Sequence, residues 1–164
     1  MTRPIKILVF GAPNIVLLDQ ITKIWVERGM RLGEIRVAIE GILNFVYVRN
    51  VGAAFGLFSS IPSAIRSPLF AVISLVAIGV IFFILRKTPE LKVILPIGLT
   101  SILGGAIGNL LDRIRLEYVI DFIDIHWRHL HWPTFNVADI AITVGVGLIL
   151  MDSWGIKTGN GKQL

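Results

Sequence analysis

Four stretches of the chain are apolar over a length that can cross a lipid bilayer. They cover about residues 7–26, 69–85, 91–111 and 137–156. A helix needs about 20 residues to span the hydrocarbon layer. The two segments that separate the first span from the second and the third from the fourth are longer and more polar. The pattern therefore predicts a mainly helical protein with four membrane spans.

The first polar segment contains a pattern with a different period. Ile35, Val37 and Ile39 alternate with more polar neighbours, which is typical of a half-buried strand. After Gly41, the sequence LNFVYV is again rich in β-branched and aromatic residues. The run VIDFID, residues 119–124, is predicted to be extended or partly helical. We expect a small sheet on the surface of the helices.

Composition excludes a soluble globular domain. Hydrophobic residues make up 54% of the 164 residues and charged residues only 16%, whereas about a quarter of a typical soluble chain is charged. The formal charge is +5, but no basic run is interleaved with aromatic residues, so we expect no nucleic-acid partner. The absence of cysteine excludes disulfides and thiolate catalysis. We interpret residues 1–164 as one domain.

The basic residues predict the orientation of the spans. An even number of spans places both termini on one side, and Lys and Arg are densest in the short ends and in the 86–92 turn. Short basic segments favour the cytoplasm, so both termini are predicted to be cytoplasmic. The start MTRPIK resembles a signal sequence, but no small-residue cleavage site follows, and we interpret it as the beginning of an uncleaved first span.

Two aspartates lie where apolar segments begin or end. Asp121 and Asp139 flank the region before the fourth span, and carboxylates at a membrane edge are costly unless they are paired or solvated. We expect the two to converge at one membrane face. Asp124 could take the place of Asp121, and Asp139 has an alternative explanation, because Asn136 as an N-cap would make it part of a capping box.

Other polar residues lie within the spans. Asp19 and Lys23 are one helical turn apart, and they either form an ion pair with Lys23 reaching outward or brace a polar site. Asn109 and Asp112 lie on or near one helical face, with Arg113 beside them. The alternative for Asp112 and Arg113 is a surface ion pair at the end of the helix.

Three histidines at positions 126, 129 and 131 suggest a metal site. Their spacing matches no common zinc pattern, and Trp127 and Trp132 beside them are typical of a membrane interface. We therefore expect interfacial histidines, no metal ion and no cofactor.

Two carboxylates held close together share one proton, so that one can act as a general base on water and the other as a general acid. Asp139, at a helix N-terminus, is the better candidate for the base, and Asp121, in apolar surroundings, for the proton holder. The chemistry favoured is peptide hydrolysis. The alternatives are a small transporter or proton-conducting protein that uses the same acids, and a structural subunit whose acids only cap and pair.

Five motifs in order resemble those of bacterial lipoprotein signal peptidase, signal peptidase II. They are DQITK (19–23), NVGAAFG (50–56), GGAIGNLLDR (104–113), VIDFID (119–124) and FNVAD (135–139). The resemblance implies an aspartic endopeptidase of the bacterial cytoplasmic (inner) membrane, with its active site toward the extracytoplasmic face. Such enzymes remove the signal peptide from diacylglyceryl-modified prolipoproteins, cutting before the lipidated cysteine. The implied fold is four transmembrane helices with a small extracytoplasmic β-sheet cradle and a periplasmic loop or helix.

The resemblance also implies roles for individual residues. The catalytic pair is Asp121 and Asp139. The positions that bind substrate or inhibitor are Asn50, Gly52, Asn109, Arg113 and Asn136, and those that support the site are Asp19, Lys23 and Asp112. The implied partners are the prolipoprotein substrate, membrane lipids and inhibitors of the globomycin type, and we expect a monomer. One departure is Glu117, where the family usually has glycine, and a positive φ there would strain this residue by about 1 kcal/mol.

Overall fold

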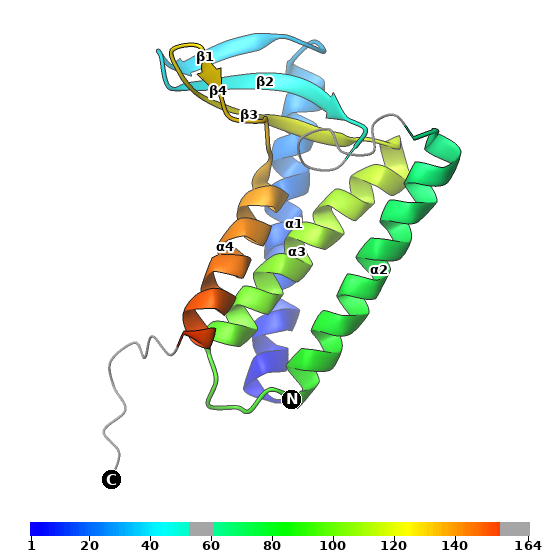
Figure 1. The fold of residues 1–164 in the computed structure, drawn as a ribbon, viewed down its shortest axis with the longest axis vertical. Coiled ribbons are helices and arrows are strands. Elements are labelled where there is room, and N and C mark those ends of the chain that lie inside the picture. Colours follow the sequence, from blue (N-terminus) through cyan, green and yellow to red (C-terminus); the bar gives the residue numbers. More distant parts are fainter. Residues whose placement is uncertain (53–60, 155–164) are drawn as a thin grey trace.

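The computed structural model describes residues 1–52 and 61–154. In this part of the chain, helices run side by side and a sheet lies across one end of them, opposite the N-terminus (Figure 1). The helices are α1 (Arg3–Gly29), α2 (Ser63–Lys87), α3 (Ile94–Leu116) and α4 (Val137–Ser153). The strands are β1 (Ile35–Ile39), β2 (Leu43–Asn50), β3 (Val119–Trp127) and β4 (Leu130–His131). The expected mainly helical fold with a small sheet is confirmed.

Three described helices are long and apolar enough to cross a membrane, namely α1, residues 64–87 of α2, and α3. Their outward surfaces carry exposed apolar side chains such as Phe10, Val76 and Phe83, which suits contact with lipid. Helix α4 has 17 residues and is therefore about 25 Å long, less than the hydrocarbon thickness of about 30 Å. The fourth span thus stays a prediction.

The observed helices coincide with the four apolar segments but differ at their ends. Helix α1 is longer than the expected span at both ends, and α3 begins three residues later than expected. Residues 155–156 of the expected fourth span and residues 53–56 of the NVGAAFG motif lie outside the described residues. The same holds for whatever part of the expected periplasmic loop or helix falls in residues 53–60.

Helix α3 is the centre of the bundle, because it packs against α1, α2 and α4. Gly105 allows the close approach of α4. A methyl group on Gly105 would collide with the backbone of Ala138 and would lie 2.8 Å from Cγ1 of Ile142. Small residues let membrane helices approach closely in this way, and the contact brings the N-terminus of α4 beside the polar face of α3.

The strands form an antiparallel sheet in the order β1-β2-β3-β4. Strand β2 pairs with β3 so that Val48 lies opposite Asp121 and Asn50 opposite Val119. The underside of the sheet contributes Tyr47, Ile120 and Phe122 to an apolar cluster with the last turn of α1. The sheet is therefore anchored on α1, and its register brings Asn50 close to Asp121.

The prediction that one face of β1 is half-buried is wrong. Ile35, Val37 and Ile39 are 62%, 66% and 53% exposed. The reason is that β1 is the edge strand and projects beyond the helix ends (Figure 1). The alternation correctly predicts a strand, but a periodic pattern does not reveal whether another element covers it.

Helix α3 ends at a strained residue. Glu117 has φ 66° and ψ 4° in the left-handed region, and its N–H donates to the carbonyl of Arg113 at 3.1 Å. A glycine usually occupies this position at the end of a helix, because a Cβ atom is disfavoured there. The positive φ suspected from the sequence is present, and it turns the chain from α3 directly into β3.

The Glu117→Gly variant should be more stable than the wild type by about 1 kcal/mol, because glycine relieves the left-handed strain. Thermal unfolding in detergent would measure the gain. The matched control is Glu117→Ala, which removes the same carboxylate but keeps the Cβ atom and should show no such gain. Equal melting temperatures for the two variants would contradict the strain.

A second pair of variants tests the approach of α3 to α4. Gly105→Ala should destabilise the protein by about 2 kcal/mol or more, because the new methyl group overlaps Ala138 and Ile142. The same substitution at Gly147 on α4 meets nothing within 4 Å and should be neutral or slightly stabilising. Unfolding curves of both variants, recorded in the same detergent, would show this contrast. A Gly105→Ala protein as stable as Gly147→Ala would disprove the close contact.

Candidate active site

Asp121 and Asp139 come together where the sheet meets the bundle. Asp121 lies on β3 and is 2% exposed, and Asp139 lies in the first turn of α4. Asn136 binds both, because its side-chain N–H donates to Oδ1 of Asp121 at 2.7 Å and its backbone N–H donates to Oδ2 of Asp139 at 3.3 Å. The N–H of Asp139 donates back to the Asn136 side chain at 2.9 Å. The capping box is thus present, and the same residue also links Asp139 to Asp121.

Two further amides complete the contacts of this pair. Asn50 on β2 donates to Oδ2 of Asp121 at 2.9 Å, and Asn109 on α3 donates to Oδ1 of Asp139 at 2.9 Å. Each of the four carboxylate oxygens therefore accepts an N–H. Hydrogen bonds of this kind orient a carboxylate and stabilise its charged form. Four separate elements, β2, α3, β3 and α4, converge to make this arrangement.

Burial raises the pKa of the Asp121 carboxyl to about 7. The hydrogen bonds from Asn50 and Asn136 lower this pKa, and the nearby charge of Asp139 raises it further. Burial is the largest effect, because an apolar environment disfavours the charged form. Asp121 thus keeps its proton up to near-neutral pH.

A buried ion cluster lies next to Asp121 and Asp139, on the other side of Asn109 from Asp139. The ammonium of Lys23 is 2.9 Å from a carboxylate oxygen of Asp19 and 2.9 Å from one of Asp112, and all three side chains are 0% exposed. Two hydrogen bonds connect the cluster to neighbouring elements. Asp19 accepts from the N–H of Ala138 at 2.9 Å, and Asp112 accepts from the N–H of Ile120 at 3.2 Å.

This geometry corrects two of the sequence-based alternatives. Lys23 does not reach outward to the membrane surface, because it has two carboxylate partners inside the bundle. Asp112 does not form a surface ion pair with Arg113, because it is buried and pairs with Lys23 instead. Asp19 and Asp112 share the ammonium of Lys23, because helix packing brings α1 close to α3.

Gln20, for which the sequence predicted no role, belongs to the cluster. Its amide donates to Asp19 at 3.1 Å, to Asp112 at 3.0 Å and to the carbonyl of Gly108 at 3.2 Å. The sequence feature that could have revealed it is a polar residue directly after Asp19, in an apolar span that also contains Lys23. The sequence alone does not reveal that Gln20 faces α3 rather than water.

Arg113 and Gly52 lie at the edge of the site. The guanidinium of Arg113 is 4.6 Å from the centre of the Phe70 ring, and it donates to the carbonyl of Gly52 at 3.3 Å. The N–H of Gly52 donates to the side-chain oxygen of Asn50 at 2.9 Å. Arg113 therefore connects α2, α3 and the chain that follows β2, and places a cation near the two aspartates.

Asp124 has other partners. It accepts from Asn44 at 2.9 Å and lies 2.8 Å from Nδ1 of His131, whose ring stacks on His126 with centroids 4.9 Å apart. An odd separation along a strand places Asp121 and Asp124 on opposite faces. Among the described residues, no group of three or more His, Asp or Glu side chains is arranged to hold a metal ion.

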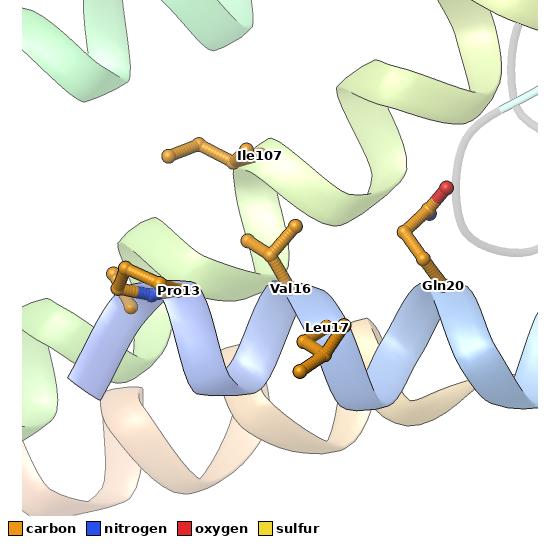
Figure 2. Close-up of a pocket in the computed structure, with 6 residues that line it drawn as sticks. Pro13, Val16, Leu17, Gln20 and Ile107 are labelled. Atoms are coloured by element: carbon orange, nitrogen blue, oxygen red, sulfur yellow. The ribbon is translucent and has the colours of Figure 1, made fainter. Parts of the chain in front are cut away.

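A groove elsewhere on the molecule runs between α1 and α3 (Figure 2). It is lined by Ala12, Pro13, Val16, Leu17, Gln20 and Ile107. This lining is almost wholly apolar and has no acid, so the groove has no group that could catalyse hydrolysis. The amide-held aspartates therefore form the candidate active site.

A pair of carboxyl groups at the end of apolar helices fits a membrane-embedded aspartic hydrolase, because two neighbouring carboxyl groups can divide the acid and base roles. The comparisons with known proteins place the chain more narrowly. A family model described as Signal peptidase (SPase) II matches residues 12–155. The chain belongs to the signal peptidase II family, and it is a peptidase. This assignment does not favour the transporter alternative.

Similar proteins agree with this family over nearly the whole chain. The lipoprotein signal peptidase of Syntrophus aciditrophicus is 41% identical over 152 residues, which cover 93% of this chain and 94% of that protein. That of Geobacter sulfurreducens is 44% identical over 137 residues and 84% of both chains. A solved bacterial membrane enzyme has a TM-score of 0.85 at 26% identity, covering 99% of this chain and 96% of the other. The protein is therefore embedded in a membrane.

The raised pKa of Asp121 predicts how pH affects stability. In the unfolded chain this carboxyl ionises near its usual value of 3.8, and in the folded protein near 7. Between these values the folded state binds the extra proton, so the group destabilises the fold as pH rises from about 4 to about 7. Asp121→Asn removes this effect. Relative to the wild type, the variant should gain more in melting temperature at about pH 8 than at about pH 5.

Asp124, on the same strand, is the matched control for this pH effect, because its pKa is shifted in the opposite direction. Burial raises its pKa, but the hydrogen bonds from His131 and Asn44 outweigh burial and leave the pKa below its usual value. Its stabilisation is present above the usual pKa and is lost on acidification through the lower, folded-state pKa. Asp124→Asn should therefore lower the melting temperature near neutral pH. A pH-independent effect of Asp121→Asn would contradict its raised pKa.

Proposed function

We propose that this peptidase removes the signal peptide from diacylglyceryl-modified prolipoproteins, cleaving before the lipidated cysteine. The names of its relatives, which are lipoprotein signal peptidases, support this substrate class. The family assignment and the acidic site at the end of the apolar helices support cleavage at a membrane face.

The observation that carries the proposal is the joint binding of both aspartates by Asn136. Asp121 and Asp139 are the catalytic residues. Asp139, half-buried at the N-terminus of α4, is the general base, since a helix N-terminus favours a carboxylate. Asp121 is the general acid, and its retention of a proton up to near-neutral pH supports this role.

The reaction then follows with protons and bonds in balance. Asp139 takes a proton from water as the water oxygen bonds to the scissile carbonyl carbon, and Asp121 gives its proton to the carbonyl oxygen. The resulting diol loses the C–N bond when Asp139 returns its proton to the leaving nitrogen. Asp121 recovers a proton as the carbonyl of the new carboxyl group forms. Acid–base catalysis of this kind contributes about 100- to 10,000-fold to a rate.

The remaining site residues divide into two roles. Asn50, Gly52, Asn109, Arg113 and Asn136 surround the aspartates and contact the substrate or an inhibitor of the globomycin type. The three asparagines already direct an N–H to an aspartate, and the N–H and carbonyl of Gly52 already have partners. Arg113, whose guanidinium has five N–H donors, is therefore the group best placed to hold the substrate backbone. Asp19, Lys23 and Asp112 support the site from behind.

The proposed setting is the bacterial cytoplasmic membrane, with both termini in the cytoplasm. In Figure 1 the N-terminus lies at the opposite end of the helices from the sheet, which supports a sheet and active site on the extracytoplasmic side. The enzyme acts as a single domain and as a monomer among membrane lipids, and it uses no metal ion or cofactor.

Substitution of either aspartate should abolish cleavage. In nanodiscs, a synthetic diacylglyceryl-modified prolipopeptide is incubated with Asp121→Asn and Asp139→Asn protein, and the released signal peptide is quantified. We expect each variant to lose at least about 100-fold in kcat, because each removes one proton-transfer group. Melting temperatures recorded alongside show that the variants are folded.

Asp124→Asn is the matched control on the same strand. Because Asp124 pairs with Asn44 and His131 rather than with the catalytic pair, it should retain cleavage within a few-fold. A dead Asp124→Asn protein with an active Asp121→Asn protein would reassign the pair. Normal cleavage by both Asp121→Asn and Asp139→Asn would disprove the aspartic mechanism.

A further inference from the structure

Lys23 uses all of its hydrogen-bonding capacity in the buried cluster. Its ammonium lies 2.9 Å from Asp19, 2.9 Å from Asp112 and 2.9 Å from Oδ1 of Asn109. An ammonium group has three donors and no acceptor. The group of Asn109 that faces Lys23 must therefore be its oxygen.

This contact decides which way the amide of Asn109 points. The oxygen and the NH₂ group of an asparagine side chain have almost the same shape, so shape alone allows either orientation. The oxygen accepts from Lys23 and, at 3.2 Å, from the side-chain N–H of Asn136. The NH₂ group is then left facing Asp139, to which it donates at 2.9 Å. A flipped amide would oppose donor to donor at Lys23 and oxygen to carboxylate at Asp139.

A single amide, that of Asn109, connects Lys23 to Asp139 but not to Asp121. Asp121 receives its side-chain N–H donors from Asn50 and Asn136. In the described contacts, neither of these asparagines touches Lys23. The cation of α1 is thus linked through Asn109 to the aspartate on α4, and the two carboxylates differ in their surroundings.

We propose that Lys23 is a positioning residue for the hydrolysis, because through Asn109 it holds an N–H donor on Asp139 and so keeps that carboxylate oriented as the base. This role rests on the proposed function and adds to the structural role of neutralising two buried acids. A purely structural Lys23 would affect folding and stability, whereas a positioning Lys23 also affects kcat in protein that is fully folded.

The test needs a variant that removes the cation without leaving a new buried charge. In Lys23→Met/Asp112→Asn, the cluster of two carboxylates and one ammonium becomes a single carboxylate, so its formal charge is −1 before and after. There are two references: the wild type, whose cluster has the same formal charge, and Asp112→Asn, which keeps the ammonium. In the nanodisc assay we expect the double variant to have a kcat about 10- to 100-fold below both references, with KM unchanged, a part of the whole acid–base contribution. Equal kcat values would overturn the proposal.

A double-mutant comparison shows whether the effect passes through Asn109. Asn109→Leu is added to Asp112→Asn and to Lys23→Met/Asp112→Asn, and kcat is measured for both. With Asn109 gone, loss of Lys23 should lower kcat no further, because residues that act as a unit are non-additive. If the two losses multiply, Lys23 does not act through Asn109.

Folding is monitored by thermal unfolding, with Lys92→Met/Asp152→Asn as the matched control. This pair has an N–O distance of 2.8 Å and links the start of α3 to the end of α4, away from the site. Its loss should leave kcat and KM unchanged. A loss of kcat in this control like that in the double variant would attribute the effect to helix packing and overturn the proposal.

Asn109→Asp decides the matter if Lys23→Met/Asp112→Asn does not fold. Its carboxylate can still pair with Lys23, so the cluster is kept, but Oδ1 of Asp139 loses its N–H donor. The proposal predicts at least a tenfold loss in kcat, and a wild-type kcat overturns it. Wild-type cleavage and its loss in Asp121→Asn and Asp139→Asn test the proposed function separately, so either idea can fail without the other.

Discussion

The rest of the site depends on the buried ion pairs of Lys23 with Asp19 and Asp112. A charge with no exposure to water is tolerated only with close partners, and Lys23 finds carboxylates on its own helix and on α3. The carboxylates in turn accept backbone N–H groups from Ala138 on α4 and Ile120 on β3. Removing the cation would leave two unpaired acids at the point where four elements meet, which is why this cluster holds the architecture together.

Close helix packing makes these contacts possible. The polar groups of α1, α3 and α4 are short-range partners. Gly105 on α3 lets the backbone of Ala138 come near, and Gly108 leaves room for the carboxylate of Asp19. The same approach places the first turn of α4, with Asp139, beside Asn109. Lipid provides the apolar surroundings for the outer faces of the helices. Association of the helices therefore depends on close packing and on hydrogen bonds between them, and buried polar groups can contribute to it.

Sequence patterns succeeded where the physical cause is local. The capping box at Asn136 and Asp139 depends on groups three residues apart, and its prediction is confirmed by the hydrogen bonds. The strand at residues 35–39 follows from alternation, and the left-handed Glu117 was suspected from its departure from the family pattern. The exposure of β1 was missed, because burial depends on what lies above a strand rather than on the strand itself.

The sequence by itself determined the class of the protein, because hydropathy over 20 residues, the local caps and the ordered motifs need no knowledge of distant contacts. It also predicted that Asp121 and Asp139 converge, and in the structure both are bound by Asn136. Only the tertiary structure decided the pairings. Lys23 and Asn109 are 86 positions apart, and Gln20 and Asp112 are 92 apart. Which groups surround the cation, and which way an amide points, are decided by distances of about 3 Å between helices, the range in which hydrogen bonds form.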